Sequence, residues 1–164
     1  MIEKTFPIAT KLLFNGLKNT QRLLELLTTE SEQLKQSSNP SALNNIASEK
    51  KETASQLEQF SKQLGQVLAT EQLLIGPEGV DSYLHKAKTA GINISEFADY
   101  WQALGNLSKK CRQLNEQNGA SIDLLSRHTQ RSLQILRGKS PLSTTYGPDG
   151  STRSELFSHT LISV

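Results

Sequence analysis

The feature that most constrains the fold is a row of residues from Leu43 to Leu74, spaced alternately three and four positions apart. This spacing places every member of the row on one side of a single α-helix. Only Lys50, Thr53 and Glu71 interrupt its apolar character. The row consists of Leu43, Ile46, Lys50, Thr53, Leu57, Phe60, Leu64, Val67, Glu71 and Leu74. It predicts a long helix whose apolar side is buried against other helices or against a partner.

The composition limits the size of the core and the class of partner. With 164 residues the chain has material for one domain, and an aromatic content of 5% leaves packing mainly to leucine. The formal net charge of +2 is too small to indicate nucleic acid binding. The composition therefore favours a narrow helical core with a large solvated surface.

Residues that cap or break helices divide the chain into segments. The first two segments cover about residues 8–36 and 41–75, because Asn39 suits an N-cap and Pro40 suits the first helical position. The breaker residues 76–79 end the second segment. The short loop between the two segments predicts an antiparallel hairpin.

Two further helices follow the breaker. Residues 80–90 predict a short connecting helix closed by Gly91, and Ser95 is expected to cap a third long helix that stops near Gly138. The residues expected to face the core are Tyr83, Leu84 and Ala87 of the short helix and Phe97, Tyr100, Trp101, Leu104, Leu107, Cys111 and Leu114 of the long one.

The predicted fold is therefore all-α: an elongated antiparallel helical bundle or coiled coil of three long helices and one short connecting helix. The bundle domain covers residues 1–138. Residues 139–164 are rich in Ser, Thr, Gly and Pro, and they predict a flexible or loosely docked tail. Inside the bundle, Lys50 is expected either to reach solvent or to meet an acid of the first helix, such as Glu25 or Glu30.

The end of the third long helix is the candidate binding site. Beyond Asn118 and Gly119 its apolar row thins, and bases outnumber acids. Such a row indicates final turns that lack a full partner within the chain, although simple fraying of a terminal helix gives the same pattern. The basic end either is a solvated face or steers an acidic partner. The candidate residues are Ile122, Leu125, Thr129, Leu133 and Leu136, with Arg127 and Arg131 for steering.

No residue pattern indicates catalysis, a cofactor or a metal site. His85, His128 and His159 are far apart in the sequence, and no phosphate-binding glycine loop or nucleophile motif is present. Cys111 is the only cysteine, so an intramolecular disulfide is impossible, as expected for a reducing compartment. Without an apolar run suited to a signal peptide or a membrane span, the sequence predicts a soluble cytoplasmic protein that is not an enzyme.

The order of these features resembles the FlgN family of flagellar type III export chaperones, over most of the chain. The combination that carries most weight is an Asn-Gly run followed about thirty residues later by a Tyr-Gly-Pro-Asp-Gly turn. The matching segments are Leu23-Leu24-Glu25-Leu26-Leu27, Ile46-Ala47-Ser48-Glu49-Lys50-Lys51 with Leu57 and Leu64 after it, Asn115-Glu116-Gln117-Asn118-Gly119, and Tyr146-Gly147-Pro148-Asp149-Gly150.

This resemblance implies a cytosolic chaperone that binds the C-terminal helical segments of hook-associated proteins, which form the hook–filament junction. Such a chaperone prevents premature assembly and delivers its clients to the flagellar export apparatus. The client-binding part of the family corresponds to residues 118–137 of this chain. Neither nucleic acid nor membrane insertion is expected, and the free protein is expected to be a monomer or a weak dimer. Residues 158–164 depart from the family pattern.

Two other classes of function compete with this interpretation. A structural coiled-coil adaptor, or a self-assembling protein without a client, would also need long helices with apolar rows. A regulator that acts through nucleic acid is disfavoured by the weak net charge. A stable symmetric oligomer would favour the adaptor, whereas capture of flagellar clients would favour the chaperone.

Overall fold

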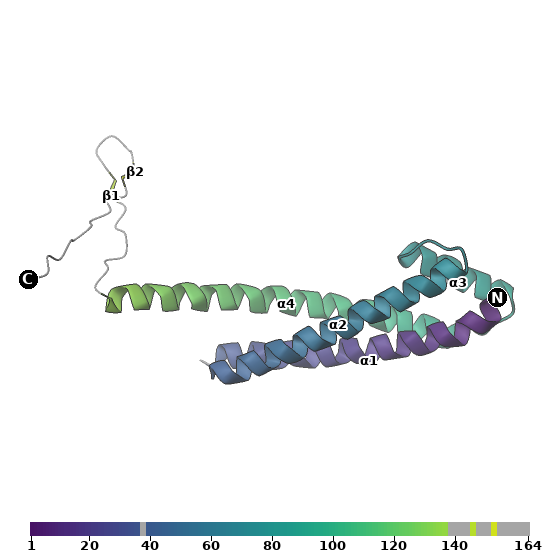
Figure 1. Cartoon of the computed structure of the whole chain (residues 1–164), viewed down its shortest axis with the longest axis horizontal. Coiled ribbons are helices and arrows are strands. Elements are labelled where there is room, and N and C mark those ends of the chain that lie inside the picture. The colour runs from purple at the N-terminus through teal and green to yellow at the C-terminus, as the bar shows by residue number, and fades with distance from the viewer. Residues whose placement is uncertain (37–38, 138–144, 147–151, 154–164) are drawn as a thin grey trace, which may run out of the picture. The chain divides into compact units, whose positions relative to one another are not determined.

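The computed structural model describes residues 1–36, 39–137, 145–146 and 152–153. Four α-helices make up most of this part of the chain (Figure 1). They are α1 (Ile2–Lys35), α2 (Pro40–Thr70), α3 (Pro77–Thr89) and α4 (Ser95–Leu136). This confirms the predicted all-α fold of three long helices and one short helix. Residues 1–121 form one compact unit and residues 122–164 form a second.

Helices α1 and α2 form the predicted antiparallel hairpin. Near the turn, the Lys50 ammonium lies 2.8 Å from the Glu30 carboxylate. At the opposite end of the hairpin, the Thr5 hydroxyl donates a 2.8 Å hydrogen bond to Glu71. Asn39 caps α2 as predicted, because its side chain accepts a hydrogen bond from the backbone N–H of Ser41.

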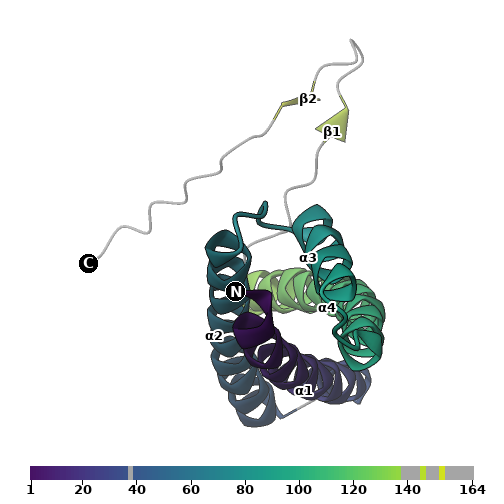
Figure 2. The same ribbon diagram turned by 90° about the vertical axis from the view of Figure 1, so that its right-hand side faces the viewer.

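Helix α4 runs parallel to α1 within residues 1–121. The Cys111 thiol lies 3.6 Å from the Thr20 carbonyl oxygen, and the Asn118 amide donates a 2.9 Å hydrogen bond to the Leu27 carbonyl oxygen. Both pairs are 91 positions apart, so the two helices advance in the same direction. Figure 2 shows α1 between α2 and the first part of α4.

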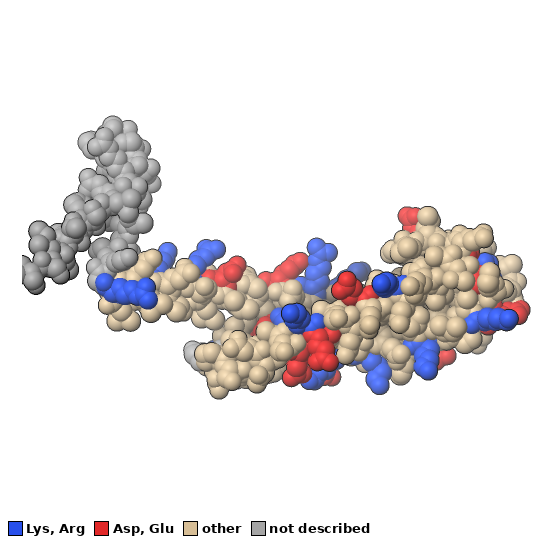
Figure 3. Space-filling view, in the orientation of Figure 1, with Lys and Arg blue, Asp and Glu red and all other residues tan. Residues whose placement is uncertain are grey.

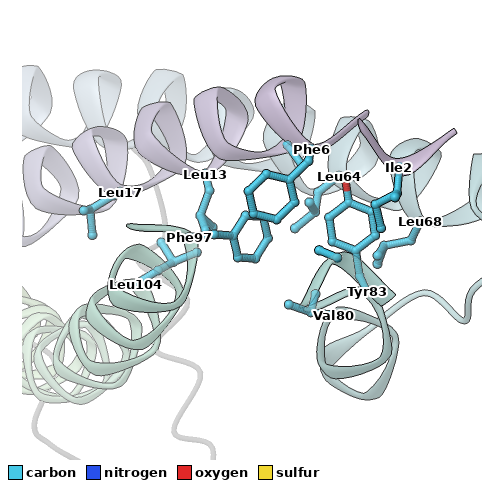
Figure 4. Close-up of a cluster of buried hydrophobic side chains, with 12 residues drawn as sticks. Ile2, Phe6, Leu13, Leu17, Leu64, Leu68, Val80, Tyr83, Phe97 and Leu104 are labelled. Carbon is cyan, nitrogen blue, oxygen red and sulfur yellow. The ribbon is translucent and has the colours of Figure 1, made fainter. Parts of the chain in front are cut away.

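The hydrophobic core gathers where all four helices meet (Figure 4). The Phe6 ring lies at its centre, with its centroid 6.0 Å from that of Tyr83 and 5.5 Å from that of Phe97. Such offset aromatic contacts add to the free energy of apolar burial. The buried members are Ile2, Phe6, Ala9, Leu13, Leu17, Leu64, Leu68, Val80, Tyr83, Ala87, Phe97 and Leu104.

Helix α3 is a part of this core and not merely the predicted connector. It begins at Pro77, so residues 77–79, which were expected to break a helix, are helical. Pro77 occupies the first helical position, where its missing N–H costs nothing. Gly79 is buried, and a Cβ atom there would overlap the carbonyl oxygen of Leu74. The close approach of α3 to the preceding loop therefore depends on this glycine.

Helix α1 begins at Ile2, earlier than the predicted start near Ile8, and contains Pro7. Proline lacks the N–H that would bond to the Glu3 carbonyl, so the helix has no backbone hydrogen bond at that position. Ile2 and Phe6 are both buried in the core, and this burial offsets the missing backbone hydrogen bond.

Helix α2 ends at Thr70, earlier than predicted. The N–H of Gln72 donates a 3.0 Å hydrogen bond to the Ala69 carbonyl, and the N–H of Leu73 donates a 2.9 Å hydrogen bond to the Leu68 carbonyl. This is a Schellman motif with Gln72 at φ 61°, where glycine is usual. Because a glutamine, and not a glycine, takes this position, the sequence does not indicate that the helix ends here.

A buried carboxylate joins α2 to α1 and α3 at the edge of the core. The Glu71 side chain is fully buried, and it accepts a 2.6 Å hydrogen bond from the Lys86 ammonium in addition to the bond from Thr5. The pKa of Glu71 is lowered, mainly by this contact with Lys86, while burial acts in the opposite direction. Glu71 therefore stays charged and holds the helix ends together.

Helix α4 is capped differently from the prediction. Ser95 is the first residue of the helix and not its cap, and its backbone N–H donates a 3.0 Å hydrogen bond to the Asn93 side chain. The helix then continues through Gly119 to Leu136.

The described residues after α4 form two short strands that the sequence did not predict. They are β1 (Thr145–Tyr146) and β2 (Thr152–Arg153), which pair antiparallel with Thr145 opposite Arg153 and Tyr146 opposite Thr152. The predicted turn at residues 146–150 lies outside the described residues except for Tyr146, and so does most of the predicted flexible tail.

Candidate partner-binding site

The predicted binding residues lie on α4 between positions 122 and 136, and all of them are exposed. Relative exposure is 42% for Ile122, 46% for Leu125, 46% for Leu133 and 82% for Leu136. The buried residues of α4, in contrast, end at Asn118. The last turns of α4 therefore present large apolar side chains to solvent.

Five of these residues lie together on one side of the helix. Their three- and four-residue spacing places them in a single row, which we call the α4 row: Ile122, Leu125, Thr129, Leu133 and Leu136. At 1.5 Å per residue the row is about 21 Å long. The Thr129 hydroxyl donates a 3.0 Å hydrogen bond to the Leu125 carbonyl, so its polar group is satisfied within the helix. The row is therefore an apolar surface of about four turns.

Arg127 and Arg131 do not lie with the α4 row. At about 100° of rotation per residue, both point to the opposite side of the helix. Both side chains are exposed, and neither forms an ion pair within the part of the chain that the structure describes. Figure 3 shows basic side chains, and fewer acidic ones, spread along α4. Any steering by these two arginines would therefore act through long-range electrostatic attraction and not through contacts beside the leucines.

A buried polar cluster precedes the α4 row. The Asn118 amide is only 2% exposed and donates hydrogen bonds of 2.9 Å to both the Leu27 carbonyl and the Glu30 carboxylate, which also binds Lys50. Of the two alternatives expected for Lys50, the pairing with an acid of the first helix is the one observed, and that acid is Glu30, whereas Glu25 pairs with Arg22. Asn118 was expected where the helix weakens, but it anchors α4 to α1.

A groove that the sequence analysis missed lies between three helices, within residues 1–121. We call it the α1–α2–α4 groove, and its volume is about 620 Å³. Its lining comes from α1 (Thr20, Leu23, Leu27), α2 (Ala47, Lys50, Lys51, Ala54, Leu57, Phe60, Ser61) and α4 (Leu104, Ser108, Cys111, Arg112, Asn115). The sequence feature that marks it is the recurrence of the small residues Ala47, Ala54 and Ser61 every seven positions of α2.

The described residues provide little for catalysis or metal binding. Among them, no group of three or more His, Cys, Asp or Glu side chains could hold a metal ion. Burial raises the pKa of the Cys111 thiol, so that less of it is present as the reactive thiolate. No helix in the described ranges is both long enough and apolar enough to cross a membrane.

Comparison with known proteins supports the family suggested by the sequence. A family model described as FlgN protein matches residues 8–154, which include almost all of the four helices. Comparisons with curated proteins and with solved structures gave no match. Because the family model covers most of the sequence, the chain belongs to the FlgN family of flagellar export chaperones.

Proposed function

We propose that this chain is a cytosolic export chaperone for hook-associated proteins of the hook–filament junction. It binds their C-terminal helical segments on the α4 row, keeps them unassembled and delivers them to components of the export apparatus. Family membership supports the general role of a flagellar export chaperone, in a family that is not enzymatic. The choice of client and of surface is the proposal.

The observation that carries the proposal is the exposure of the α4 row. Four large apolar side chains in one helical row are costly to leave in water, and such a row is suited to the apolar side of another helix. The helix that presents them is anchored just before the row by Asn118, so its position in the bundle is defined up to that residue. A client helix would bury the row, because side chains spaced three and four positions apart on one helix pack between those of another.

Truncation of two central leucines tests the surface. The double variant Leu125→Ala, Leu133→Ala should bind the C-terminal segment of a hook-associated protein more weakly by about 1–3 kcal/mol per anchor. The cost arises because the apolar contacts are lost, while the helix keeps its fold since alanine is a strong helix former. Isothermal titration calorimetry measures the affinity, and circular dichroism checks the helicity.

The matched control is the double variant Leu124→Ala, Ile135→Ala. These two residues are also exposed on α4, but they lie on the side away from the α4 row. Its affinity should equal that of the unmodified protein. Equal losses in both double variants would mean that α4 has no preferred binding side, and no loss in either would remove α4 from client binding.

Self-association is the alternative use of the same row. If two copies pair through α4 and no client binds, sedimentation velocity would show a dimer that the Leu125→Ala, Leu133→Ala variant abolishes. That result would support the structural adaptor in place of the chaperone.

Charge reversal at Arg127 and Arg131 should mainly slow client association and reduce its dependence on salt.

A further inference from the structure

We propose that the α1–α2–α4 groove is a second docking site, which takes an amphipathic protein helix with acidic residues along the borders of its apolar side. This goes beyond the proposed function, which places the client on the α4 row. The groove lies wholly within residues 1–121, in the unit that also holds the core.

The floor of the groove is an apolar surface that the bundle leaves uncovered. Leu23, Leu57 and Phe60 line it and are only partly buried, although Leu57 and Phe60 belong to the regular row of α2. The other members of that row on either side, Thr53 and Leu64, are buried. The α2 row is therefore covered by α1 and the core before and after Leu57 and Phe60. These two residues, which line the groove, are the uncovered part of the row.

The shape of the groove suits a helix. Small residues at Ala47, Ala54 and Ser61 border it along α2, and Ser108 borders it on α4. Small side chains let another backbone approach closely. The stretch from Ala47 to Ser61 is about 21 Å long at the helical rise, which is about four turns. A fourth helix placed there would complete a bundle with α1, α2 and α4.

The charges of the groove determine the sign of its occupant. Its lining contains three basic residues, Lys50, Lys51 and Arg112, and no acidic residue. Lys50 is bound by Glu30 inside the bundle. Among the described residues Arg112 pairs with the exposed Glu116 one turn along α4, a contact of little strength. Lys51 and Arg112 therefore supply positive charge on the α2 and α4 borders, which an acidic helix would complement.

A second copy of this chain is a poorer occupant. One uncovered apolar helix surface that it would offer is the α4 row, which is bordered by the uncharged Ser126 and Ser132 and not by acidic residues. Docking that row in the groove would leave Lys51 and Arg112 without acidic partners. An acidic helix from another protein would place negative charges beside both residues.

The test uses two designed peptides of about 18 residues with the same leucine row. One carries glutamate at the positions that flank the leucines, and the other carries lysine there. The full-length protein should bind the glutamate peptide at least tenfold more tightly than the lysine peptide at low salt, and the difference should shrink at high salt. Equal binding of the two peptides, or no binding of the glutamate peptide, would overturn the proposal.

Two pairs of variants locate the binding in the groove. Ala54→Trp fills the groove and should weaken glutamate-peptide binding at least tenfold, whereas Ser55→Trp, on the neighbouring exposed position outside the lining, should not. Lys51→Glu should weaken binding, whereas Lys62→Glu, which is also on α2 but outside the lining, should have little effect. Binding that is unchanged in both Ala54→Trp and Lys51→Glu would place the peptide elsewhere and refute the groove as its site.

The same measurements separate this proposal from the function proposed above. The peptides have designed sequences that match no flagellar client, so a wrong choice of client leaves their binding unaffected. The Leu125→Ala, Leu133→Ala variant should retain glutamate-peptide binding, because the α4 row lies outside the groove lining. Loss of peptide binding in that variant would show that the α4 row, and not the groove, holds the acidic helix.

Discussion

The Glu71 carboxylate illustrates how a single charged residue stabilises the junction of three helices. Its side chain is fully buried but has partners on α1 and α3, so its charge is compensated by Lys86 and Thr5. Removing one partner of such a group lowers the free energy of unfolding by more than the intact pair contributes to it, because the other group remains desolvated or unpaired. The sequence showed Glu71 only as an irregularity in an apolar row.

The lowered pKa of Glu71 predicts a pH-dependent free energy of unfolding. As the pH falls below the ordinary value of 4.5, the unfolded chain takes up a proton before the folded chain does, so stability is lost between that value and the lower pKa of the folded state. Glu71→Gln should therefore be less stable than the unmodified protein at pH 7, by about 1–3 kcal/mol, with a smaller difference at pH 3. Urea unfolding at the two pH values measures this.

Glu58→Gln is the control for this prediction, because Glu58 is an exposed acid of α2, the helix that Glu71 follows. It should have almost the same stability as the unmodified protein at both pH values. A Glu71→Gln variant with an unchanged stability at pH 7 would show that the Lys86 contact does not hold the helix ends together.

Individual contacts were predictable from the sequence only where periodicity pointed to them. The pairing of Lys50 with an acid of α1 followed from a charge inside an apolar row, and the structure identifies that acid as Glu30. Asn118 could not be recognised in the same way, because an asparagine before a glycine usually indicates a helix end. Its two hydrogen bonds to α1 depend on the packing of α4, which the local sequence does not encode.

Among the helices, type and number were predictable, as was the start of α2, whereas several other ends were not. Periodicity and the Asn39-Pro40 cap identified the hairpin, because both are local signals. The start of α1 was displaced because burial of Ile2 and Phe6 offsets the hydrogen bond lost at Pro7. The start of α3 was displaced because Pro77 suits the first position of a helix. The α1–α2–α4 groove was also missed, since a row of partly covered residues looks like a fully covered row in the sequence.

The end of α2 offers a test of this interpretation of helix termination. Gln72 has a positive φ, which costs about 1 kcal/mol for a residue with a Cβ atom and almost nothing for glycine. Gln72→Gly should therefore raise the melting temperature by about 2–4 °C, as measured by differential scanning calorimetry. Gln63→Gly, at an exposed position inside α2, should lower it because glycine weakens a helix interior. If both variants were destabilised alike, Gln72 would not be the strained terminator of α2.

At the scale of the whole molecule, α4 has buried side chains in its first part and exposed apolar side chains in its last turns. Buried residues extend through α4 only as far as Asn118, and the apolar side chains beyond it are exposed. The end of the helix was predicted as a binding surface from its sequence, together with fraying as the alternative. The exposed last turns of α4 are compatible with both interpretations, partner binding and fraying.

Hydrogen exchange measured by mass spectrometry on the full chain, with and without the C-terminal segment of a hook-associated protein, distinguishes binding from fraying. In the free protein, amides of residues 122–136 should exchange faster than those of residues 97–118, because no buried side chain holds them. Bound client should slow exchange in residues 122–136. Client binding that leaves exchange in residues 122–136 unchanged would contradict the proposal that α4 holds the client.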